Sequence, residues 1–405
     1  MTSEFTSDFF RNNRTRLRAL FGRSAPIVIG ASGLLQRNGD NTYPFRQDSN
    51  FWYLTGVNVA DAILVMDQDK EYIIVPDQQV HQTIFDGPIL QEVLTARSGV
   101  DTILSEKEGW SRLSKRLKQA KQVATLVAPE AYLEFYGFYT NPARAALQEK
   151  IKAANTELEV LDVRQQLASL RMVKQPPELA TIKKAITITI NTLEEVRARL
   201  GSYGFEYEIE ADLTQSYRKK GAKGHAFHPI VAAGLNACTI HYTTNGDSLS
   251  DTRFVLLDTG AEVDEYAADL GSTYWLTEKN SRETAIYEAV LAVQAFAYGV
   301  LKPGVLIREY EKQIEQYMGE KLSELGLIQS IERETVRKYF PHATSHHVGL
   351  DAHDAADYEQ PLQPGMVLAV EPGIYIPEEK TGIRIENNVL ITESGIEILS
   401  QGLVQ

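Results

Sequence analysis

The residues with the clearest chemical potential are carboxylates set among apolar residues in the second half of the chain. The segment FVLLDTGAEVDEYAADLGSTYWL has two β-like arms around a polar turn near Glu262 to Asp264. A turn centred between Val263 and Asp264 sets Asp258 opposite Asp269, with the two side chains roughly 5 Å apart. Two like charges at that separation repel each other, so the pattern calls for a compensating group.

A second segment, VEPGIYIPEEKTGIRIENNVLI, has the same construction around a turn from Pro377 to Gly382. A centre between Glu378 and Glu379 sets Glu371 opposite Glu386. Unpartnered buried carboxylates each cost several kcal/mol, a cost that metal coordination offsets. Two such pairs in apolar strands therefore indicate that a divalent cation lies between them.

An alternative is that these acids face solvent or pair with a nearby base such as Arg384. Arg384 lies two positions before Glu386 and so on the same strand face, where it could support the ligands from behind. One arginine cannot balance four carboxylates, so the metal hypothesis is favoured.

Histidines cluster in the same part of the chain. Of the 8 histidines, all but His81 lie between His225 and His353. In PHATSHHVGLDAHD, His342 and His346 are four residues apart, and His353 follows a possible turn at Gly349. A lone histidine is usually structural, whereas a cluster interleaved with carboxylate pairs favours metal and substrate chemistry.

Charge balance favours two ions. Four carboxylates and one neutral imidazole carry a charge that two divalent cations cancel. Such a site makes a nucleophile from water at neutral pH. Ligands that are mostly oxygen, with one imidazole and no thiolate, suit Mn²⁺, with Co²⁺, Fe²⁺ or Zn²⁺ as possible substitutes.

The elements that must position these residues divide the chain in two, because 405 residues exceed one ordinary core. Short apolar runs at 25–31 and 72–76 predict strands, and 103–121 has helical spacing, which indicates an α/β first half. We predict an N-terminal domain over 1–165, a linker over 166–173 and a catalytic domain over 174–405.

The second half is predicted to be α+β. Pro176 and Pro177 followed by Glu178 mark the start of a long amphipathic helix. Two further helical runs, Ser281 to Val300 and Ile307 to Leu325, alternate with strand-like pieces such as RFVLLDTG and MVLAVEPGIYI. An antiparallel sheet with helices is the expected result.

Composition limits the function classes. Hydrophobic residues make up 43% and charged residues 23% of the chain, as in a soluble globular protein. The net charge of −13 argues against a nucleic-acid partner, and no apolar run is long enough for a membrane span. The N-terminus has no signal-peptide core, and Cys238 is the only cysteine, so we expect a cytoplasmic protein without disulfides.

Taken together, these motifs resemble the pita-bread metallopeptidases, and the aminopeptidase P family most closely. The resemblance covers most of the chain, in family order: RNGDNTYPFRQDSNFWYLTG, HYTTN, LLDTGAEVDEYAADL, SHHVGLDAHD, EPGIYI and GIRIENN. It implies an α/β N-terminal domain and an α+β pita-bread catalytic domain. It also implies removal of the N-terminal residue from peptides whose second residue is proline.

The resemblance further implies a ligand set. Asp269 and Glu386 would bridge two metal ions, Asp258 would complete the shell of one ion, and His346 with Glu371 that of the other. A bridging hydroxide would attack the scissile carbonyl. Glu371 would take the proton from the metal-bound water and pass it to the leaving prolyl nitrogen.

Five further residues match substrate-side and supporting positions of the family. His241 and His353 would bind the peptide and its developing oxyanion, and His342 would line the proline side of the cleft. Tyr375 and Arg384 would support the acids. Ordinary packing is the alternative role for these residues.

Some positions depart from the family pattern. PHATSH replaces the usual HGxxH context, and His347 stands where relatives often carry a large aromatic residue. Family members use an N-terminal tryptophan that reaches a neighbouring subunit, and the candidate here is Phe85 in QTIFDGPIL. The resemblance implies a homodimer or homotetramer formed through the N-terminal domain.

Two other functions stay open. A prolidase shares the metal site but hydrolyses only Xaa-Pro dipeptides, and the serine at Ser345 favours aminopeptidase P over it. A catalytically silent peptide-binding or scaffold protein is the alternative of a different class, and the intact ligand set argues against it.

Overall fold

The computed structural model describes residues 4–21, 25–68, 70–127, 133 and 137–404. The chain divides into two compact units, Met1–Leu170 and Arg171–Gln405. Helix α8 (Arg164–Arg171) runs up to this division and covers much of the predicted linker. Within the described part of the chain, no helix has both the length and the apolarity needed to cross a membrane.

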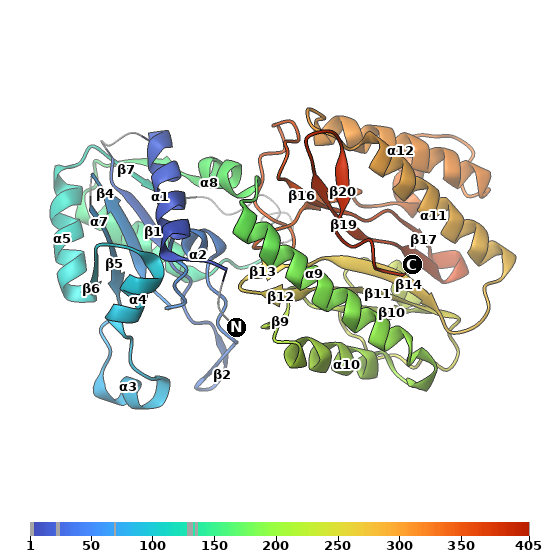
Figure 1. The fold of residues 1–405 in the computed structure, drawn as a ribbon, viewed down its shortest axis with the longest axis horizontal. Helices are drawn as coiled ribbons and strands as arrows, with labels where there is room; N and C mark the ends of the chain where they lie inside the picture. The colour runs from blue at the N-terminus through green and yellow to red at the C-terminus, as the bar shows by residue number, and fades with distance from the viewer. Residues whose placement is uncertain (1–3, 22–24, 69, 128–132, 134–136, 405) are drawn as a thin grey trace. The chain divides into compact units, whose positions relative to one another are not determined.

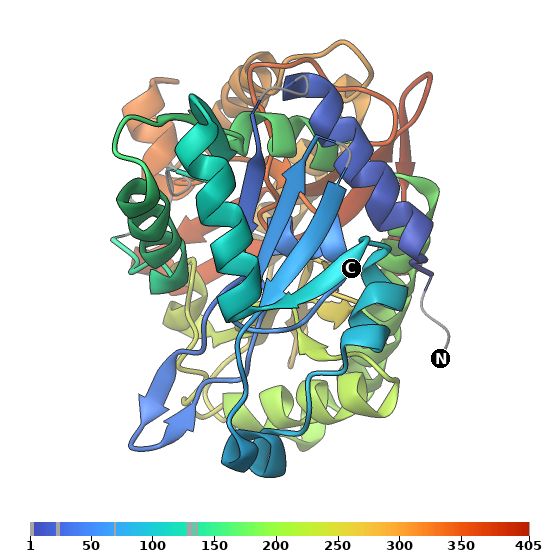
Figure 2. The same cartoon turned by 90° about the vertical axis from the view of Figure 1, so that its left-hand side faces the viewer.

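The N-terminal unit is built on a mixed six-stranded sheet, whose strands lie side by side in Figure 2. The strand order is β6-β5-β4-β1-β7-β8, with parallel pairs β5/β6, β1/β7 and β7/β8 and antiparallel pairs β1/β4 and β4/β5. Its strands are β1 (Ile27–Gly30), β4 (Ile63–Asp67), β5 (Lys70–Val75), β6 (Thr102–Ser105), β7 (Gln122–Thr125) and β8 (Glu159–Asp162).

Helices connect the strands of this unit, as expected for an α/β domain. They are α1 (Ser7–Phe21), α2 (Ser49–Thr55), α3 (Val80–Asp86), α4 (Gln91–Ser98), α5 (Glu106–Gln119) and α7 (Pro142–Ala154), and a small hairpin is formed by β2 (Gln36–Asn38) and β3 (Asn41–Thr42). The predicted strands at 25–31 and 72–76 are confirmed as β1 and β5. The helix predicted from residue 103 begins later, because Thr102–Ser105 forms β6 and Ser105 then caps α5.

The C-terminal unit begins with α9 (Pro176–Arg197), where the predicted double-proline start is confirmed. The other helices of the unit are α10 (Glu206–Lys219), α11 (Ser281–Val300), α12 (Ile307–Glu324) and α13 (Arg333–Tyr339), with short 3₁₀ turns η1 (Leu200–Ser202), η2 (Gly234–Cys238) and η3 (Pro377–Glu379). Helix α11 has the predicted bounds, and α12 ends one residue early.

The strands of this unit pair antiparallel in small sheets, ordered β10-β11-β14, β13-β12-β9, β15-β16-β19-β20 and β17-β18. They are β9 (Gly224–His225), β10 (Ile230–Ala233), β11 (Phe254–Thr259), β12 (Ala261–Val263), β13 (Tyr266–Ala267), β14 (Leu270–Trp275), β15 (Ser345–His347), β16 (Val367–Val370), β17 (Gly373–Ile376), β18 (Thr381–Arg384), β19 (Asn387–Ile391) and β20 (Ile396–Ile398). Apolar side chains of α11 and α12 pack with those of β16 to β19 in one core, which covers one side of these strands.

The first acidic hairpin runs from β11 to β14, and its predicted register is wrong. The structure pairs Asp258 with Gly271, not with Asp269. The two-residue turn falls on Asp264 and Glu265, both with positive φ (45° and 69°), so its centre lies one residue later than predicted. Asp258 and Asp269 therefore lie diagonally on one face of the hairpin.

The second acidic hairpin runs from β16 to β19 and has the predicted register. Pairs Val370↔Asn387 and Gly373↔Arg384 belong to one continuous alignment, and Glu371 and Glu386 face each other within it. Both acids lie between strands: Glu371 between β16 and β17, and Glu386 between β18 and β19. The prediction that these two glutamates oppose each other is confirmed.

Candidate metal centre

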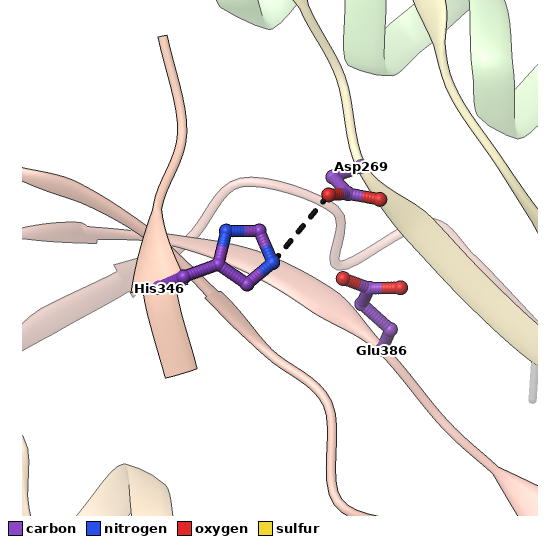
Figure 3. A group of neighbouring side chains, drawn as sticks. All are labelled: Asp269, His346 and Glu386. Atoms are coloured by element: carbon purple, nitrogen blue, oxygen red, sulfur yellow. Dashed lines mark ion pairs between the residues drawn. The ribbon is translucent and has the colours of Figure 1, made fainter. Parts of the chain in front are cut away.

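Three buried side chains form the centre of the site. Nε2 of His346, a carboxylate oxygen of Asp269 and a carboxylate oxygen of Glu386 all lie within 4.8 Å of one another. Figure 3 shows the two acids pointing toward the imidazole, whose Nε2 is 3.5 Å from Asp269 Oδ2. His346 Nδ1 donates a hydrogen bond to the His347 carbonyl oxygen (3.2 Å), which leaves Nε2 as the nitrogen available to a metal.

The other two predicted ligands adjoin this group. Glu371 Oε1 is 3.5 Å from His346 Nε2. Asp258 is buried and pairs with Gly271, which forms a β-bridge to Glu386, and the charge of Asp258 raises the pKa of both Asp269 and Glu386. The structure thus brings all five predicted ligands together.

Gly271 joins the two hairpins at the site. It pairs with Asp258 on one side and forms a β-bridge to Glu386 on the other, with Glu386 N donating to Gly271 O (2.9 Å). A Cβ atom at Gly271 would lie 3.1 Å from both Cβ and Oε2 of Glu386. Because glycine has no side chain, position 271 leaves room for the Glu386 carboxylate next to the strand that carries Asp258.

One arginine compensates the carboxylates only in part: the charge of Arg384 lowers their pKa values, but burial and the neighbouring acids outweigh it. Burial, followed by the charges of Asp258 and Glu371, raises the pKa of Asp269 well above its usual range. Burial and the charge of Glu386 do the same to the pKa of Glu371, and burial and Asp269 to that of Glu386. Burial lowers the pKa of His346. The raised pKa values disfavour the ionised carboxylates that bind metal, so a cation is needed to stabilise them, whereas the lowered pKa of His346 keeps its imidazole in the neutral form that can ligate.

Unpartnered atoms support the same conclusion. Asp258 Oδ1 and Glu386 Oε2 are buried and accept no hydrogen bond from any described residue. A buried carboxylate oxygen in this condition carries a desolvation cost that coordination removes. The oxygen-rich donor set with one imidazole fits divalent ions such as Mn²⁺ or Zn²⁺.

A hydrogen-bonded chain runs from the acids to His342. Arg384 Nη2 donates to Asp258 Oδ2 (2.5 Å) and Nη1 donates to the Tyr375 hydroxyl (2.9 Å). His342 Nδ1 donates to the Ala343 carbonyl (2.8 Å), so Nε2 accepts the proton of the Tyr375 hydroxyl (2.7 Å). The predicted supporting roles of Arg384 and Tyr375 agree with these contacts, although Arg384 pairs with Asp258 rather than with Glu386.

His342 is held neutral in this chain. Burial and the charge of Arg384 lower the pKa of His342 to about 3. Its Nδ1 is 3.8 Å from Glu371 Oε2. The imidazole therefore faces the predicted proton shuttle without forming an ionised pair at neutral pH.

His353 and His241 lie at the rim of the site. The ring of His353 stacks on that of His346, with centroids 3.8 Å apart and an interplanar angle of 6°. Although part of its surface is open to solvent, neighbouring groups shield the ring of His353, and this shielding together with His241 lowers its pKa. His241 is exposed, and its electrostatic effect lowers the pKa of His342 as well as that of His353.

The two departures from the family pattern have different surroundings. His347 is buried and packs edge-on against Tyr358, with centroids 5.5 Å apart. Burial and the charge of Lys174 lower the pKa of His347 to about 3, so its imidazole is neutral. Phe85 lies on α3 with 84% of its surface exposed.

Two groups of supporting residues were missed at the sequence level. Asp354 accepts hydrogen bonds from Arg171 (2.5 Å) and Lys174 (3.0 Å), all three buried, next to the loop that carries His353. Glu206 is fully buried at the start of α10 and holds the loop that carries His241. Adjacency to His353 could have drawn attention to Asp354, but nothing local to Glu206 connects it with His241.

The geometry can be compared with known proteins. Residues 180–393 match metallopeptidase family M24, and residues 10–125 match the aminopeptidase P N-terminal domain. The chain belongs to metallopeptidase family M24. The predicted enzyme class is thereby confirmed, as is a fold with an aminopeptidase P N-terminal domain and a pita-bread catalytic domain.

The similarity of this M24 protein to relatives extends over its whole length. It is 33% identical to a Xaa-Pro aminopeptidase of Haemophilus influenzae, over 96% of this chain and 93% of that protein. It is 30% identical to the Xaa-Pro aminopeptidase of Escherichia coli, over 100% of this chain and 96% of that one. The predicted resemblance to aminopeptidase P is confirmed.

Solved structures show the same similarity. Aminopeptidase P from Escherichia coli superposes with a TM-score of 0.86 at 29% identity, covering 100% of this chain and 97% of that chain. Proline aminopeptidase P II from Yersinia pestis gives a TM-score of 0.85 at 30% identity, covering 99% and 97%. Both domains of this M24 protein therefore have full-length structural counterparts.

Proposed function

We propose that the protein is a Xaa-Pro aminopeptidase, which hydrolyses the bond between an N-terminal residue and a following proline. The observation that carries the proposal is the convergence of Asp269, His346 and Glu386, with Glu371 and Asp258 adjoining them. The named activity of relatives that match over the full chain supports the proline preference.

The proposed metal ligands are the five residues predicted from the sequence. When bound, two divalent ions would supply a water of lowered pKa and polarise the scissile carbonyl. We propose manganese, with cobalt, iron or zinc as substitutes. A zinc-substituted Escherichia coli aminopeptidase P in complex with product is among the similar structures, which supports such substitution.

The chain's own residues would then handle protons and substrate. Glu371 faces His342 and His346, a position from which it can accept a proton and return it to the leaving prolyl nitrogen. His353 and His241, at the rim, would donate hydrogen bonds to the peptide and to the oxyanion. His342 would line the proline side of the cleft.

The direct test is a comparison of three substrates after manganese loading: a Xaa-Pro-Xaa tripeptide, a Xaa-Pro dipeptide and a Xaa-Ala-Xaa tripeptide. We expect release of the N-terminal residue from the Xaa-Pro tripeptide and none from the alanine peptide. Hydrolysis of the dipeptide alone would instead identify a prolidase. Elemental analysis should find about two divalent ions per chain, and no bound metal after loading would support a scaffold protein.

We also propose that the protein assembles as a homodimer or homotetramer through the N-terminal unit. Helix α3 has no buried residue, and Val80, Ile84 and Phe85 expose 80%, 76% and 84% of their surfaces. Exposed apolar residues gathered on one short helix are typical of an interface. Light scattering on Phe85→Asp beside the parent protein tests this: the variant should have a lower mass. A cytoplasmic location stays a prediction, supported by the single cysteine.

A further inference from the structure

Glu206 is a buried carboxylate outside the predicted metal ligands. It is the first residue of α10 and has no exposed surface. Its Oε1 accepts hydrogen bonds from the Ala233 amide (2.9 Å) and Asn236 Nδ2 (3.1 Å). Its Oε2 accepts them from the Tyr242 hydroxyl (2.8 Å) and the Asp247 amide (2.9 Å).

These four donors belong to the two ends of one loop, residues 233–247. One carboxylate oxygen holds the beginning of the loop and the other holds its end. His241 lies between the two attachment points and directly precedes Tyr242. The position of the His241 imidazole is thus connected to Glu206 through the neighbouring side chain.

A second attachment comes from the same helix. Asn245, buried and with a positive φ of 45°, donates through Nδ2 to Glu210 Oε2 (2.8 Å) and to the Pro229 carbonyl (2.9 Å). Glu206 and Glu210 are four residues apart, which places them on one face of α10. This helix face therefore holds the loop at points on both sides of His241 in the sequence.

We propose that Glu206, acting through Tyr242, is a positioning residue that fixes His241 for contact with the peptide substrate. The proposal rests on the proposed function, in which His241 binds substrate. None of the four donors belongs to a proposed metal ligand, so the effect of Glu206 is on His241 and not on metal loading.

The chemistry requires a carboxylate and not an amide. Hydrogen bonds to an ionised acceptor are roughly twice as strong as neutral ones. Both oxygens of Glu206 face donors, so a glutamine would turn its NH₂ group toward two N–H or O–H groups in either orientation. Glu206→Gln would therefore release one end of the loop.

The experiment uses a pair of matched tyrosine variants in the manganese-loaded full chain. Tyr242→Phe removes only the hydroxyl that donates to Glu206. The control is Tyr203→Phe, because the Tyr203 hydroxyl donates to Asp212 of the same helix (2.7 Å) but lies outside the loop. The readouts are kcat and KM on a Xaa-Pro tripeptide, metal content, and hydrogen exchange of amides 239–247.

Tyr242→Phe should lower kcat about tenfold, as expected when a group that donates to the developing oxyanion is displaced, with KM and metal content within about twofold of the parent. Glu206→Gln should lower kcat further. Tyr203→Phe should leave kcat within about twofold. In a His241→Ala background, Tyr242→Phe should cause no further loss, because its effect acts through His241.

Two results would overturn the proposal while leaving the aminopeptidase intact. One is an equal kcat for the two tyrosine variants. The other is a loss from Tyr242→Phe that persists in full in the His241→Ala background. If the parent protein cleaves no Xaa-Pro peptide, the proposed function fails by itself. Hydrogen exchange then decides separately, since positioning by Glu206 requires faster exchange at 239–247 in Tyr242→Phe than in Tyr203→Phe.

Discussion

The two acidic hairpins present their carboxylates in different ways. In the hairpin from β11 to β14, Asp258 and Asp269 lie diagonally, and glycines occupy the positions directly across from them. In the hairpin from β16 to β19, Glu371 and Glu386 face each other in an interruption of the strands. Two acids on one face of a strand pair can thus be accommodated in two ways: they are offset along the strands, or the strand pairing is interrupted where they face each other.

Removing a ligand from either hairpin should have the largest effect. Asp269→Asn and Glu386→Gln should each lower activity at least about a thousandfold and reduce bound metal, since both side chains are proposed to bridge the ions. His353→Ala should lower turnover about a hundredfold with metal content unchanged, because His353 is a proposed substrate contact and not one of the proposed metal ligands. Steady-state kinetics with elemental analysis checks all three variants. Near-normal activity and metal in Asp269→Asn would show that the ligand assignment is wrong.

Replacing one glycine of each hairpin by alanine should separate an effect on metal affinity from an effect on turnover. In Gly271→Ala, the new Cβ would lie 3.1 Å from Glu386 Oε2, which should weaken metal affinity about tenfold to a hundredfold. In Gly373→Ala it would lie 2.4 Å from the Tyr375 hydroxyl, so turnover should fall with metal affinity less affected. Gly299→Ala is the control, because no atom lies within 4 Å of its added Cβ. Equal metal affinity in all three variants would contradict the expectation that only Gly271→Ala disturbs a proposed metal ligand directly.

The turn end of the first hairpin is attached to a buried acid, which predicts a pH effect on stability. Tyr266 donates to Glu178 Oε1 (2.8 Å), and burial raises the pKa of Glu178 from 4.5 to about 7. Between these two pH values the folded state binds more protons than the unfolded state. The free energy of unfolding should therefore fall as pH rises through this range, by at most about 3 kcal/mol.

Glu178→Gln removes this titration. Urea unfolding at pH 5, 6 and 7 should show that the free energy of unfolding of the parent protein decreases with pH. In the variant, the decrease that Glu178 causes should be missing. Parallel pH profiles for the two proteins would show that Glu178 titrates normally in the folded state.

The turn end of the second hairpin is attached through exposed charges and should show the smallest effect. Arg282 donates to both oxygens of Glu379 (2.8 and 3.0 Å), but the two side chains are 37% and 34% exposed, so solvent screens the pair. Glu379→Gln should change the free energy of unfolding by less than about 1 kcal/mol and leave activity unchanged. If the free energy of unfolding in urea fell by more than about 2 kcal/mol, this turn would contribute to stability as much as the first one.

The contrast between the hairpins also marks how far sequence reasoning extends. The second turn contains Pro377 and is bounded by Gly382, residues whose backbone preferences identify a turn and its centre. The first turn uses Asp264 and Glu265 with positive φ, a conformation that glycine and asparagine usually signal. Lys223, about forty residues away, binds the Glu265 carboxylate (2.7 and 2.8 Å). A contact so distant in sequence leaves no local pattern, so the register could not be predicted.

The same reasoning applies to the site. The residues that converge on His346 could be predicted because acids in apolar strands are costly without a cation. Gly271 and Glu206 could not, since one acts by leaving space and the other by holding a loop that begins 27 residues later. Both depend on which strands and loops come together in three dimensions.

The β-bridge between Gly271 and Glu386 has a consequence for biosynthesis. Two of the five acids and imidazoles precede residue 270 and three follow residue 345, so a nascent chain holds an incomplete set until its last segment leaves the ribosome. The proposed ligand set is therefore completed only by segments made late in synthesis. A chain truncated before Glu386 would lack one of the proposed ligands and the backbone group that pairs with Gly271.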